Sequence, residues 1–325
     1  MNYLKRRSVL GGMLGAGAWP AGAGAAGWPA KPVQWIVPYP PGGGSDTFAR
    51  PIAADLTHRL GQSMLIDNRS GAAGTVGTAL AARSAPDGYT LLLGDTGLVY
   101  APAIYPKAGF DFGRDFAPVS ALARAPYALV VNPQRVEAPT LAAFLAGAKA
   151  RPDSVDFGSP GLGSIAHLAI DLLEDRTGTK FNHVPYRGGA PMLQDLLAGQ
   201  IAAAFVLASA VAGHVKTGKL RALAVANRRR EAVLPDVPTT AEAGLDDFRV
   251  TIWFGVFAPR RTPAAILDRA HDAIQAALET DEVKRVWREQ SARVELESRA
   301  DFARFIDREI QRWTARARAA NVQME

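Results

Sequence analysis

A glycine-rich loop between a predicted strand and a predicted helix is the first candidate for chemistry. Residues 39–46 read YPPGGGSD, in which three glycines precede a serine and an aspartate. The apolar run 33–39 predicts a buried strand, and residues 47–60 predict a helix. Glycine lets the backbone adopt positive φ and lets another group approach the main chain closely. Because the helix leaves unpaired N–H groups and the positive end of its dipole at the loop, the sequence predicts an anion site there.

Three further turns also precede predicted helices, at residues 70–75, 158–164 and 187–191. If two or more of these turns face one cleft, they present N–H groups to a ligand from both sides. A carboxylate suits such a cleft, since a charge-assisted hydrogen bond is about twice as strong as a neutral one. Neutral donors also avoid the desolvation of a second buried charge. The hydroxyl groups expected to assist belong to Ser45, Thr75, Thr96, Ser159 and Ser164.

Four side chains near these turns each have two interpretations. Asp46 is more often a helix cap or turn-stabilising residue than a base. His167, in the first turns of its predicted helix, is either a ligand contact or a hydrogen-bonded wall residue. Arg187 either pairs with an anion or is simply exposed. Trp253 is either a wall of the cleft or part of the core.

Several kinds of chemistry have no support in the sequence. There is no cysteine, so disulfides, thiol nucleophiles and thiolate metal sites are excluded. The five histidines are scattered and form no HExxH pattern. The nucleophile elbow GxSxG, the phosphate loop GxxxxGK[ST] and a GxGxxG ahead of an acidic residue are also missing. We therefore expect no catalytic residue, no metal and no cofactor.

The first 25 residues predict a secretory signal peptide. Lys5, Arg6 and Arg7 precede a short apolar stretch and then small residues suited to cleavage. The same arginines resemble a twin-arginine signal. A membrane anchor is less favoured, because the stretch is too short and is broken by glycine and proline. Removing the leader changes the net charge from +6 to +3, with 34 basic and 31 acidic residues. That balance suits an anionic ligand but does not favour nucleic acid.

The order of the elements predicts an α/β protein with two lobes. The pattern of strand, glycine-rich turn and helix begins at residue 33 and starts again at residue 155. We expect one domain from 26–127 and 227–325, and a second from 128–226. Each should hold a mostly parallel sheet flanked by helices, with a hinge of two strands and the ligand between the lobes.

Two other segments carry specific expectations. Residues 100–115 show no periodicity and are expected to be irregular. The last helix has an apolar stripe that is more often packed on its own domain than on a partner. The stripe consists of Phe302, Phe305, Ile306, Ile310, Trp313 and Ala317.

Six segments, in order along the chain, resemble the Bug family of periplasmic solute receptors, which serve tripartite tricarboxylate transporters. They read PYPPGGGSDTFAR, IDNRSGAAGTVGTALAARSAPDGYTLLLG, FGSPGLGSIAHLA, NHVPYRGGAPMLQDLLAGQI, LPDVPTTAEAG and WFGVFAPRRTP. The resemblance implies a type II periplasmic-binding-protein fold that closes on its ligand. It also implies export to the periplasm with the signal peptide cleaved, no enzymatic activity, and membrane transporter subunits as partners. We expect a monomer.

In the family, main-chain N–H groups and waters from loops corresponding to 39–46 and 159–164 hold a carboxylate. Ligands in the family include di- and tricarboxylates, acidic amino acids, nicotinate and aromatic acids. Residues 201–206 lack the acidic side chain that is frequent there, so an amino-acid ligand loses a plausible partner. Residues 258–263 read APRRTP where the family often has APAGTP, which we interpret as a surface change. The predicted ligand-binding residues are Tyr39, Gly43, Gly44, Ser45, Asp46, Gly74, Thr75, Thr96, Ser159, Gly161, Ser164, His167, Arg187, Gly188, Phe205 and Trp253.

The predicted function is capture of a small organic carboxylate in the interdomain cleft and its delivery to a membrane transporter. An alternative is a ligand-sensing subunit for a membrane two-component kinase. A secreted hydrolase is disfavoured by the missing nucleophile elbow and requires a Ser/His pair in the cleft. Phe205, Trp253 and an alanine-rich strand favour an apolar or aromatic carboxylate over an amino acid.

Overall fold

The computed structural model describes residues 27–320, apart from 43, 187, 291 and 295. The predicted signal peptide therefore lies outside the described residues, as do Gly43 and Arg187 of the predicted site. Within the described ranges, no helix is long and apolar enough to cross a membrane.

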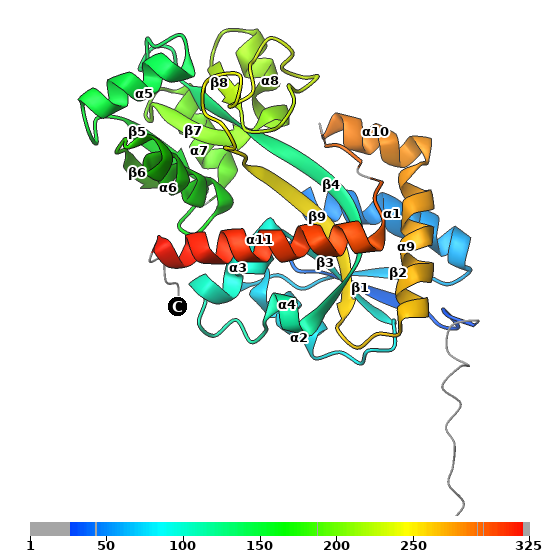
Figure 1. Cartoon of the computed structure of the whole chain (residues 1–325). Helices are drawn as coiled ribbons and strands as arrows, with labels where there is room; N and C mark the ends of the chain where they lie inside the picture. Colours follow the sequence, from blue (N-terminus) through cyan, green and yellow to red (C-terminus); the bar gives the residue numbers. More distant parts are fainter. Residues whose placement is uncertain (1–26, 43, 187, 291, 295, 321–325) are drawn as a thin grey trace, which may run out of the picture.

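The chain builds part of one lobe, crosses to a second and returns (Figure 1). The elements before the first crossing are β1 (Val33–Val37), α1 (Gly44–Leu60), β2 (Met64–Asn68), a 3-10 turn (Ala72–Gly74), α2 (Thr75–Ala82), β3 (Thr90–Asp95), α3 (Thr96–Ile104) and α4 (Phe112–Asp115). The crossing strand is β4 (Phe116–Val131). The second lobe contains α5 (Leu141–Ala150), β5 (Asp156–Ser159), α6 (Ile165–Thr177), β6 (Asn182–Pro185), α7 (Gly189–Leu197), β7 (Ala203–Leu207), α8 (Ala208–Lys216) and β8 (Arg221–Val225). After the return come β9 (Thr251–Pro259), α9 (Ala264–Leu278), α10 (Asp281–Glu289) and α11 (Arg299–Ala319).

The strands form the two-lobed α/β architecture that the sequence predicts. Their order is β2-β1-β3-β9-β4-β7-β5-β6, and β8 also pairs with β4. Parallel pairing joins β1 to β2 and β3, and β5 to β6 and β7. The antiparallel pairs of the described strands all involve β4 or β9, which are the strands next to the crossings. The carboxyl ends of the parallel strands carry the glycine-rich loops, where ligands bind in such sheets.

Strand β4 belongs to both lobes. Its residues 116–126 pair with β9, and residues 127–131 pair with β7 and β8. The apolar runs 116–123 and 127–131 belong to one continuous strand, whose pairing is interrupted only by register shifts. A single hydrogen-bonded strand therefore connects the sheets, and the chain returns through residues 226–250.

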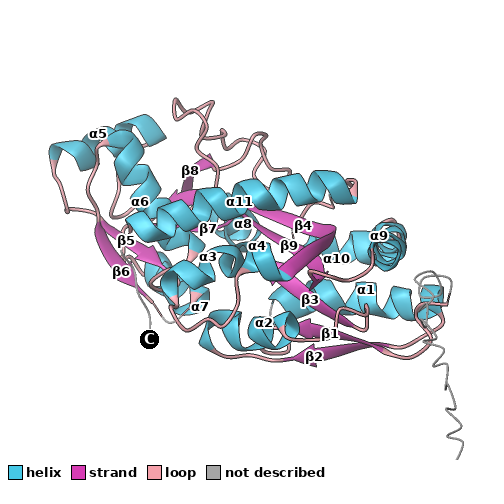
Figure 2. Cartoon of the chain, turned by 60° about the horizontal axis from the view of Figure 1, so that its bottom comes forward, coloured by secondary structure: helices cyan, strands magenta, loops and turns pink. Residues whose placement is uncertain are grey.

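Alternate residues of the central strands face two different cores, as the period of a strand requires. Trp35 packs in the core beneath α1 and α9, whereas Ile36 packs in the core shared with α3 and α11. Figure 2 shows α9 and α11 as separate layers of the first lobe. The stripe on α11 is confirmed as an internal surface, because Phe302, Ile306 and Trp313 are buried against the same chain.

The expectation that residues 100–115 are irregular is wrong for residues 100–104 and 112–115, which belong to α3 and α4, whereas residues 105–111 connect these helices. Helix α3 starts directly after β3, with the Asp95 carboxylate accepting hydrogen bonds from Gly97 N (2.8 Å) and Leu98 N (3.2 Å). Helix α3 is apolar on almost every side because it lies between the sheet and α11, so no amphipathic pattern marks it. It also contains Pro102, which is unusual inside a helix.

Gly255 of β9 provides a test of this packing. A Cβ atom there would lie 2.3 Å from Phe302 Cζ and 3.2 Å from the Ser120 carbonyl oxygen. Overpacking of this kind typically costs about 1–3 kcal/mol, so we expect Gly255→Ala to lower the free energy of unfolding by that amount, measured by urea denaturation. The control is Gly213→Ala in α8, where no atom lies within 4 Å of the added Cβ. It should stabilise the protein by about 0.5–1 kcal/mol, because alanine is the better helix former. Equal stability of the two variants would contradict this packing.

Candidate ligand-binding site

The first lobe brings together three of its strand ends at Tyr39. Gly74 has a φ of +91°, and a Cβ atom there would lie 3.1 Å from Tyr39 Cζ and 3.0 Å from Leu98 Cδ2. Only glycine fits this close approach without strain. The Tyr39 hydroxyl makes a hydrogen bond with the Asp95 side chain. The loops after β1, β2 and β3 therefore converge on one tyrosine.

The side chain of Asp95 caps the N-terminus of α3, so this helix end already has a carboxylate from the chain itself. Asp95 is buried, and burial raises its pKa against the opposing effect of hydrogen bonds from Tyr39, Leu98 N and Gly97 N. Burial, followed by the charge of Asp95, raises the pKa of Tyr39 well above its usual value. Tyr39 is therefore a neutral donor at physiological pH. Thr96 is fully buried, and its Oγ1 accepts a hydrogen bond from Trp253 N at 2.9 Å.

Asp46 has the turn-stabilising role that was the preferred interpretation. Its carboxylate accepts hydrogen bonds from Gly42 N (2.9 Å), Arg50 Nε (2.6 Å) and Asn68 Nδ2 (3.1 Å). Burial opposes ionisation of Asp46, but these hydrogen bonds outweigh it and lower the pKa. Asn68 Nδ2 also lies 3.1 Å from the Tyr39 carbonyl oxygen, so Asn68 joins the two ends of the loop.

Neighbouring Gly44 begins α1, and Ser45 is buried. Thr75 begins α2 and donates its hydroxyl to the Ala72 carbonyl.

The second lobe contributes the loop between β5 and α6. Tyr186 N donates to the Ser159 carbonyl, and Gly188 N donates to the Pro160 carbonyl, both at 2.9 Å. These bonds fix the loop against the turn that precedes α7. Gly161 has a φ of +147°, in the region that favours glycine. The predicted residues of this lobe therefore lie together, with Ser159, Gly161 and Ser164 in one loop and Gly188 in the next.

Helix α6 begins with an incompletely occupied N-terminus. Ser164 Oγ caps it by accepting from His167 N at 3.2 Å, and His167 Nδ1 accepts from Gly163 N at 3.0 Å. In the described chain, the amides of Ile165 and Ala166 have no protein acceptor. Two N–H groups and the positive end of the helix dipole are thus available to an anion.

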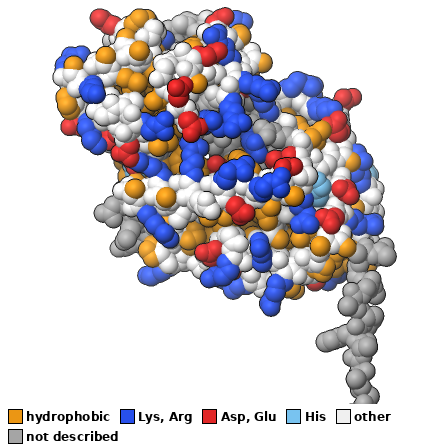
Figure 3. Space-filling view, in the orientation of Figure 1, with side chains coloured by type: hydrophobic (Ala, Val, Ile, Leu, Met, Phe, Trp, Pro, Cys, Tyr) orange, Lys and Arg blue, Asp and Glu red, His pale blue; other side chains and the backbone are white. Residues whose placement is uncertain are grey.

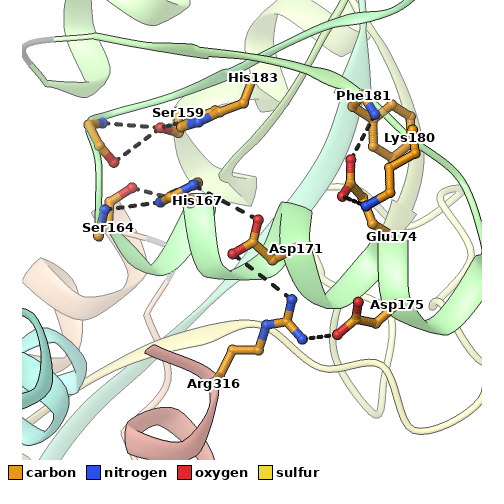
Figure 4. A network of polar contacts seen from close by, with 12 residues as sticks. Ser159, Ser164, His167, Asp171, Glu174, Asp175, Lys180, Phe181, His183 and Arg316 are labelled. Carbon is orange, nitrogen blue, oxygen red and sulfur yellow. Dashed lines mark hydrogen bonds and ion pairs between the residues drawn. The ribbon is translucent and has the colours of Figure 1, made fainter. Parts of the chain in front are cut away.

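The two sets of loops meet at α3. Gly163 has a φ of +72°, and a Cβ atom there would lie 2.8 Å from Ile104 Cδ1 in the first lobe. The lobes also meet where Arg316 of α11 pairs with Asp175 and approaches Asp171 of α6 (Figure 4). The α6 loop is therefore adjacent to the first lobe in this structure.

His183 is a component of the site that the sequence analysis did not single out. Its Nε2 lies 2.7 Å from Ser159 Oγ, and its ring stacks on His167 with centroids 4.1 Å apart (Figure 4). Its only signal in the sequence was its place in the segment NHVPYRGG. The contact between His183 and Ser159 depends on the parallel register of β5 and β6, which residue types alone do not reveal. His183 holds the serine that opens the loop.

The Ser159–His183 pair does not have the arrangement of a hydrolase. Ser159 has no exposed surface, and its hydroxyl also lies 3.1 Å from the oxygen and 3.2 Å from the nitrogen of Gly161. Catalysis by a serine needs an accessible oxygen and a third group that orients the base. The contacts of Ser159 instead indicate that it shapes the loop.

The two predicted aromatic contacts lie in the core. Phe205 has no exposed surface and packs against Phe157 and Phe248. Trp253 is 1% exposed, and its indole N–H donates to Glu309 at 2.9 Å. The structure does not bring either side chain to the loops, so the core interpretation of Trp253 is the one that applies.

Comparison with known proteins identifies the family. A model described as "Tripartite tricarboxylate transporter family receptor" matches residues 48–322. The chain belongs to this family. BugT of Bordetella pertussis is 37% identical to this receptor, with 100% of both chains covered. The family consists of periplasmic solute-binding receptors rather than enzymes.

Two solved structures are similar to this receptor along most of its length. R. palustris Rpa4515 with adipate is 35% identical, with a TM-score of 0.76, and the match covers 91% of this chain and 100% of that one. MatC (Rpa3494) from Rhodopseudomonas palustris with bound malate is 33% identical, with a TM-score of 0.73, and the match covers 89% and 100%.

Titration of the stacked histidines provides a second test. Burial, and secondarily the charge of His167, lowers the pKa of His183 to about 4. At His183 the folded receptor therefore binds fewer protons than the unfolded chain between pH 6.5 and pH 4, and the stability that this residue contributes falls as the pH falls through this window. His183 contributes at most about 3 kcal/mol to the free energy of unfolding, and solvent screening reduces this value because the ring is only partly buried.

We expect His183→Gln to flatten the pH dependence of the melting temperature between pH 6.5 and pH 4. Glutamine keeps a donor near Ser159 but does not titrate. The matched control is His58→Gln on α1, which is exposed and should leave the profile unchanged. If the melting temperature changes equally steeply with pH in both variants and in the wild type, His183 does not have this depressed pKa.

Proposed function

We propose that this chain is a periplasmic receptor that binds a small dicarboxylate between its lobes and delivers it to the membrane subunits of a tripartite transporter. The observation that carries the proposal is the free N-terminus of α6, with the amides of Ile165 and Ala166 available beside the Ser159–Ser164 loop. One carboxylate would bind there, where N–H donors and the helix dipole favour negative charge.

The second carboxylate would face the first lobe. There α2 begins at Thr75 without a side-chain cap, and Gly74, which precedes it, lies directly against Tyr39. The ligand-contacting set that we propose combines both lobes. It comprises Tyr39, Gly74, Thr75, Ser159, Gly161, Ser164, Ile165, Ala166, His167 and Gly188.

Two exposed apolar side chains favour a ligand with a carbon chain between its carboxylates. Val76, in the first turn of α2, is 53% exposed, and Leu162, in the α6 loop, is 47% exposed. Large exposed apolar residues commonly contact a ligand or partner. The earlier reason for an aromatic acid does not apply, since Phe205 and Trp253 are buried. Dicarboxylates bind the similar receptors Rpa4515 (adipate) and MatC (malate).

The proposal includes export and movement of the lobes. Cleavage of residues 1–25 would release the mature receptor into the periplasm. We propose 26–127 with 227–325, and 128–226, as the two bodies that close on the ligand. Closure would bring the α6 loop and Tyr39 onto opposite ends of the same molecule.

A thermal-shift series tests the ligand class. Adipate and malate should raise the melting temperature of the mature chain, while the amino dicarboxylate aspartate and the monocarboxylate benzoate should not. At a hundredfold excess over the dissociation constant, binding should add about 2.7 kcal/mol to the stability.

Gly74→Ala should weaken dicarboxylate binding at least about tenfold in calorimetry, because the added Cβ displaces Tyr39.

The matched control is Gly147→Ala in α5, where nothing lies within 4 Å of the new Cβ. Its affinity should equal that of the wild type. Melting of each unliganded variant separates loss of binding from loss of folding. Absence of any dicarboxylate shift, both before and after unfolding, dialysis and refolding, would rule the proposal out, as would chemical turnover of the bound acid.

A further inference from the structure

A second concave region lies where the two segments that join the lobes, near residues 124–126 and 227–251, meet α6 and α11. We call these segments the linking strands. The region has a volume of about 960 Å³ and a partly apolar floor that includes Pro126, Leu172 and Phe248. Figure 3 shows basic side chains gathered around a hollow between the lobes. Eight arginines line the cavity, namely Arg124, Arg176, Arg228, Arg229, Arg249, Arg293, Arg308 and Arg312. None of its lining residues belongs to the proposed carboxylate site.

The charge of the chain is concentrated at this cavity. Its lining contains eight arginines and two carboxylates, Asp247 and Glu309, a net charge of +6. The whole chain of 325 residues also has a net charge of +6. All other positions together are therefore neutral overall, and the cavity is the basic region of the molecule.

The two carboxylates already have other partners. Asp247 pairs with Arg249 at 2.7 Å, and Glu309 accepts the indole N–H groups of Trp253 and Trp313 at 2.9 and 3.1 Å. In the part of the chain that the structure describes, five lining arginines have no carboxylate partner. These are Arg176, Arg228, Arg229, Arg308 and Arg312.

These cations line one cavity and are close enough for Arg249 and Arg176 to act on the charge of Arg312. Burial lowers the pKa of Arg312 against the charges of Glu309 and Asp247, which raise it, and the charges of Arg249 and Arg176 lower it further. Arg312 donates to the Arg249 carbonyl at 2.7 Å, and Arg176 donates to the Asp246 carbonyl at 2.7 Å. Backbone oxygens orient both guanidinium groups, and the two carboxylates of the cavity offset only part of the charge of its eight arginines.

We propose that this cavity is a second anion site, which binds a small soluble molecule carrying two or more phosphate groups. Arginine presents a planar fork of donors that matches phosphate oxygens, and several such forks suit several phosphates. The volume lies within the range of about 300–1,000 Å³ that is usual for small-molecule sites. A single carboxylate would neutralise only a small part of the charge.

The bound molecule would contact both lobes. Arg176 belongs to α6 in the second lobe, whereas Arg308 and Arg312 belong to α11 in the first. A polyphosphate that bridges them would hold α6 and α11 together on the side of the molecule formed by the linking strands.

Isothermal titration of the mature full chain with inorganic tripolyphosphate tests the proposal. We expect one molecule bound per chain, weaker binding of orthophosphate, and no competition from a dicarboxylate. The double variant Arg229→Ala/Arg308→Ala should lose at least about tenfold in affinity, since a hydrogen bond to a charged group contributes about 1.5–3 kcal/mol. The matched control is Arg318→Ala, another exposed arginine of α11 that lies outside the cavity. Its affinity should stay within about twofold of the wild type.

Three results would overturn the proposal. The first is no heat of binding with tripolyphosphate at millimolar concentration. The second is an equal loss in the double variant and in Arg318→Ala, which would indicate general attraction to a basic protein. The third is sedimentation with phosphatidylglycerol vesicles that requires Arg229 and Arg308, without tripolyphosphate binding, which would identify a lipid surface instead. Circular-dichroism melting of every variant confirms that the compared proteins are folded.

Discussion

Strand β4 is the constraint on which the arrangement of both sites depends. Residues 116–126 of this strand are hydrogen-bonded to β9 in one lobe, and residues 127–131 to β7 and β8 in the other. Buried backbone groups must keep their hydrogen bonds, so the lobes cannot separate without bending this strand. Its register shifts are the natural places for such bending, because the ladder is already interrupted there. The same strand therefore positions both the glycine-rich loops of the proposed carboxylate site and the arginine cavity.

The helix N-termini of the site are used unequally. Asp95 places the chain's own carboxylate at α3, and Asp46 accepts from the loop before α1. A second negative charge beside either would be repelled. The N-terminus of α6 has a serine cap and a histidine whose pKa is lowered by burial, and it leaves two amides without protein acceptors in the described chain. This difference, rather than the presence of glycines, is why we propose the α6 loop as the place for a ligand carboxylate.

The sequence predicted the elements whose signals are local. Apolar runs followed by glycine-rich loops identified the strand–loop–helix units at β1 and β5, and the periodicity of α11 identified its buried face. Helix α3 was missed because tertiary burial on nearly all sides removes its amphipathic pattern. Ser159 was predicted but its partner His183 was not, since only the register of β5 with β6 brings the two together. Exposure could not be read from residue type either, as Trp253 and Phe205 show.

Helix α6 connects the two proposed sites physically. Its first turn offers Ile165 and Ala166 to a carboxylate, and its last turns place Leu172 and Arg176 in the arginine cavity. Between them, Asp171 and Asp175 meet Arg316 of the first lobe, so the helix is held from the side by the opposite lobe. A helix of 13 residues moves as one rigid body over this length. Displacement of α6 during the proposed closure on a dicarboxylate would therefore change the spacing of the arginines, and an anion that fixes this spacing would change the energy of closure.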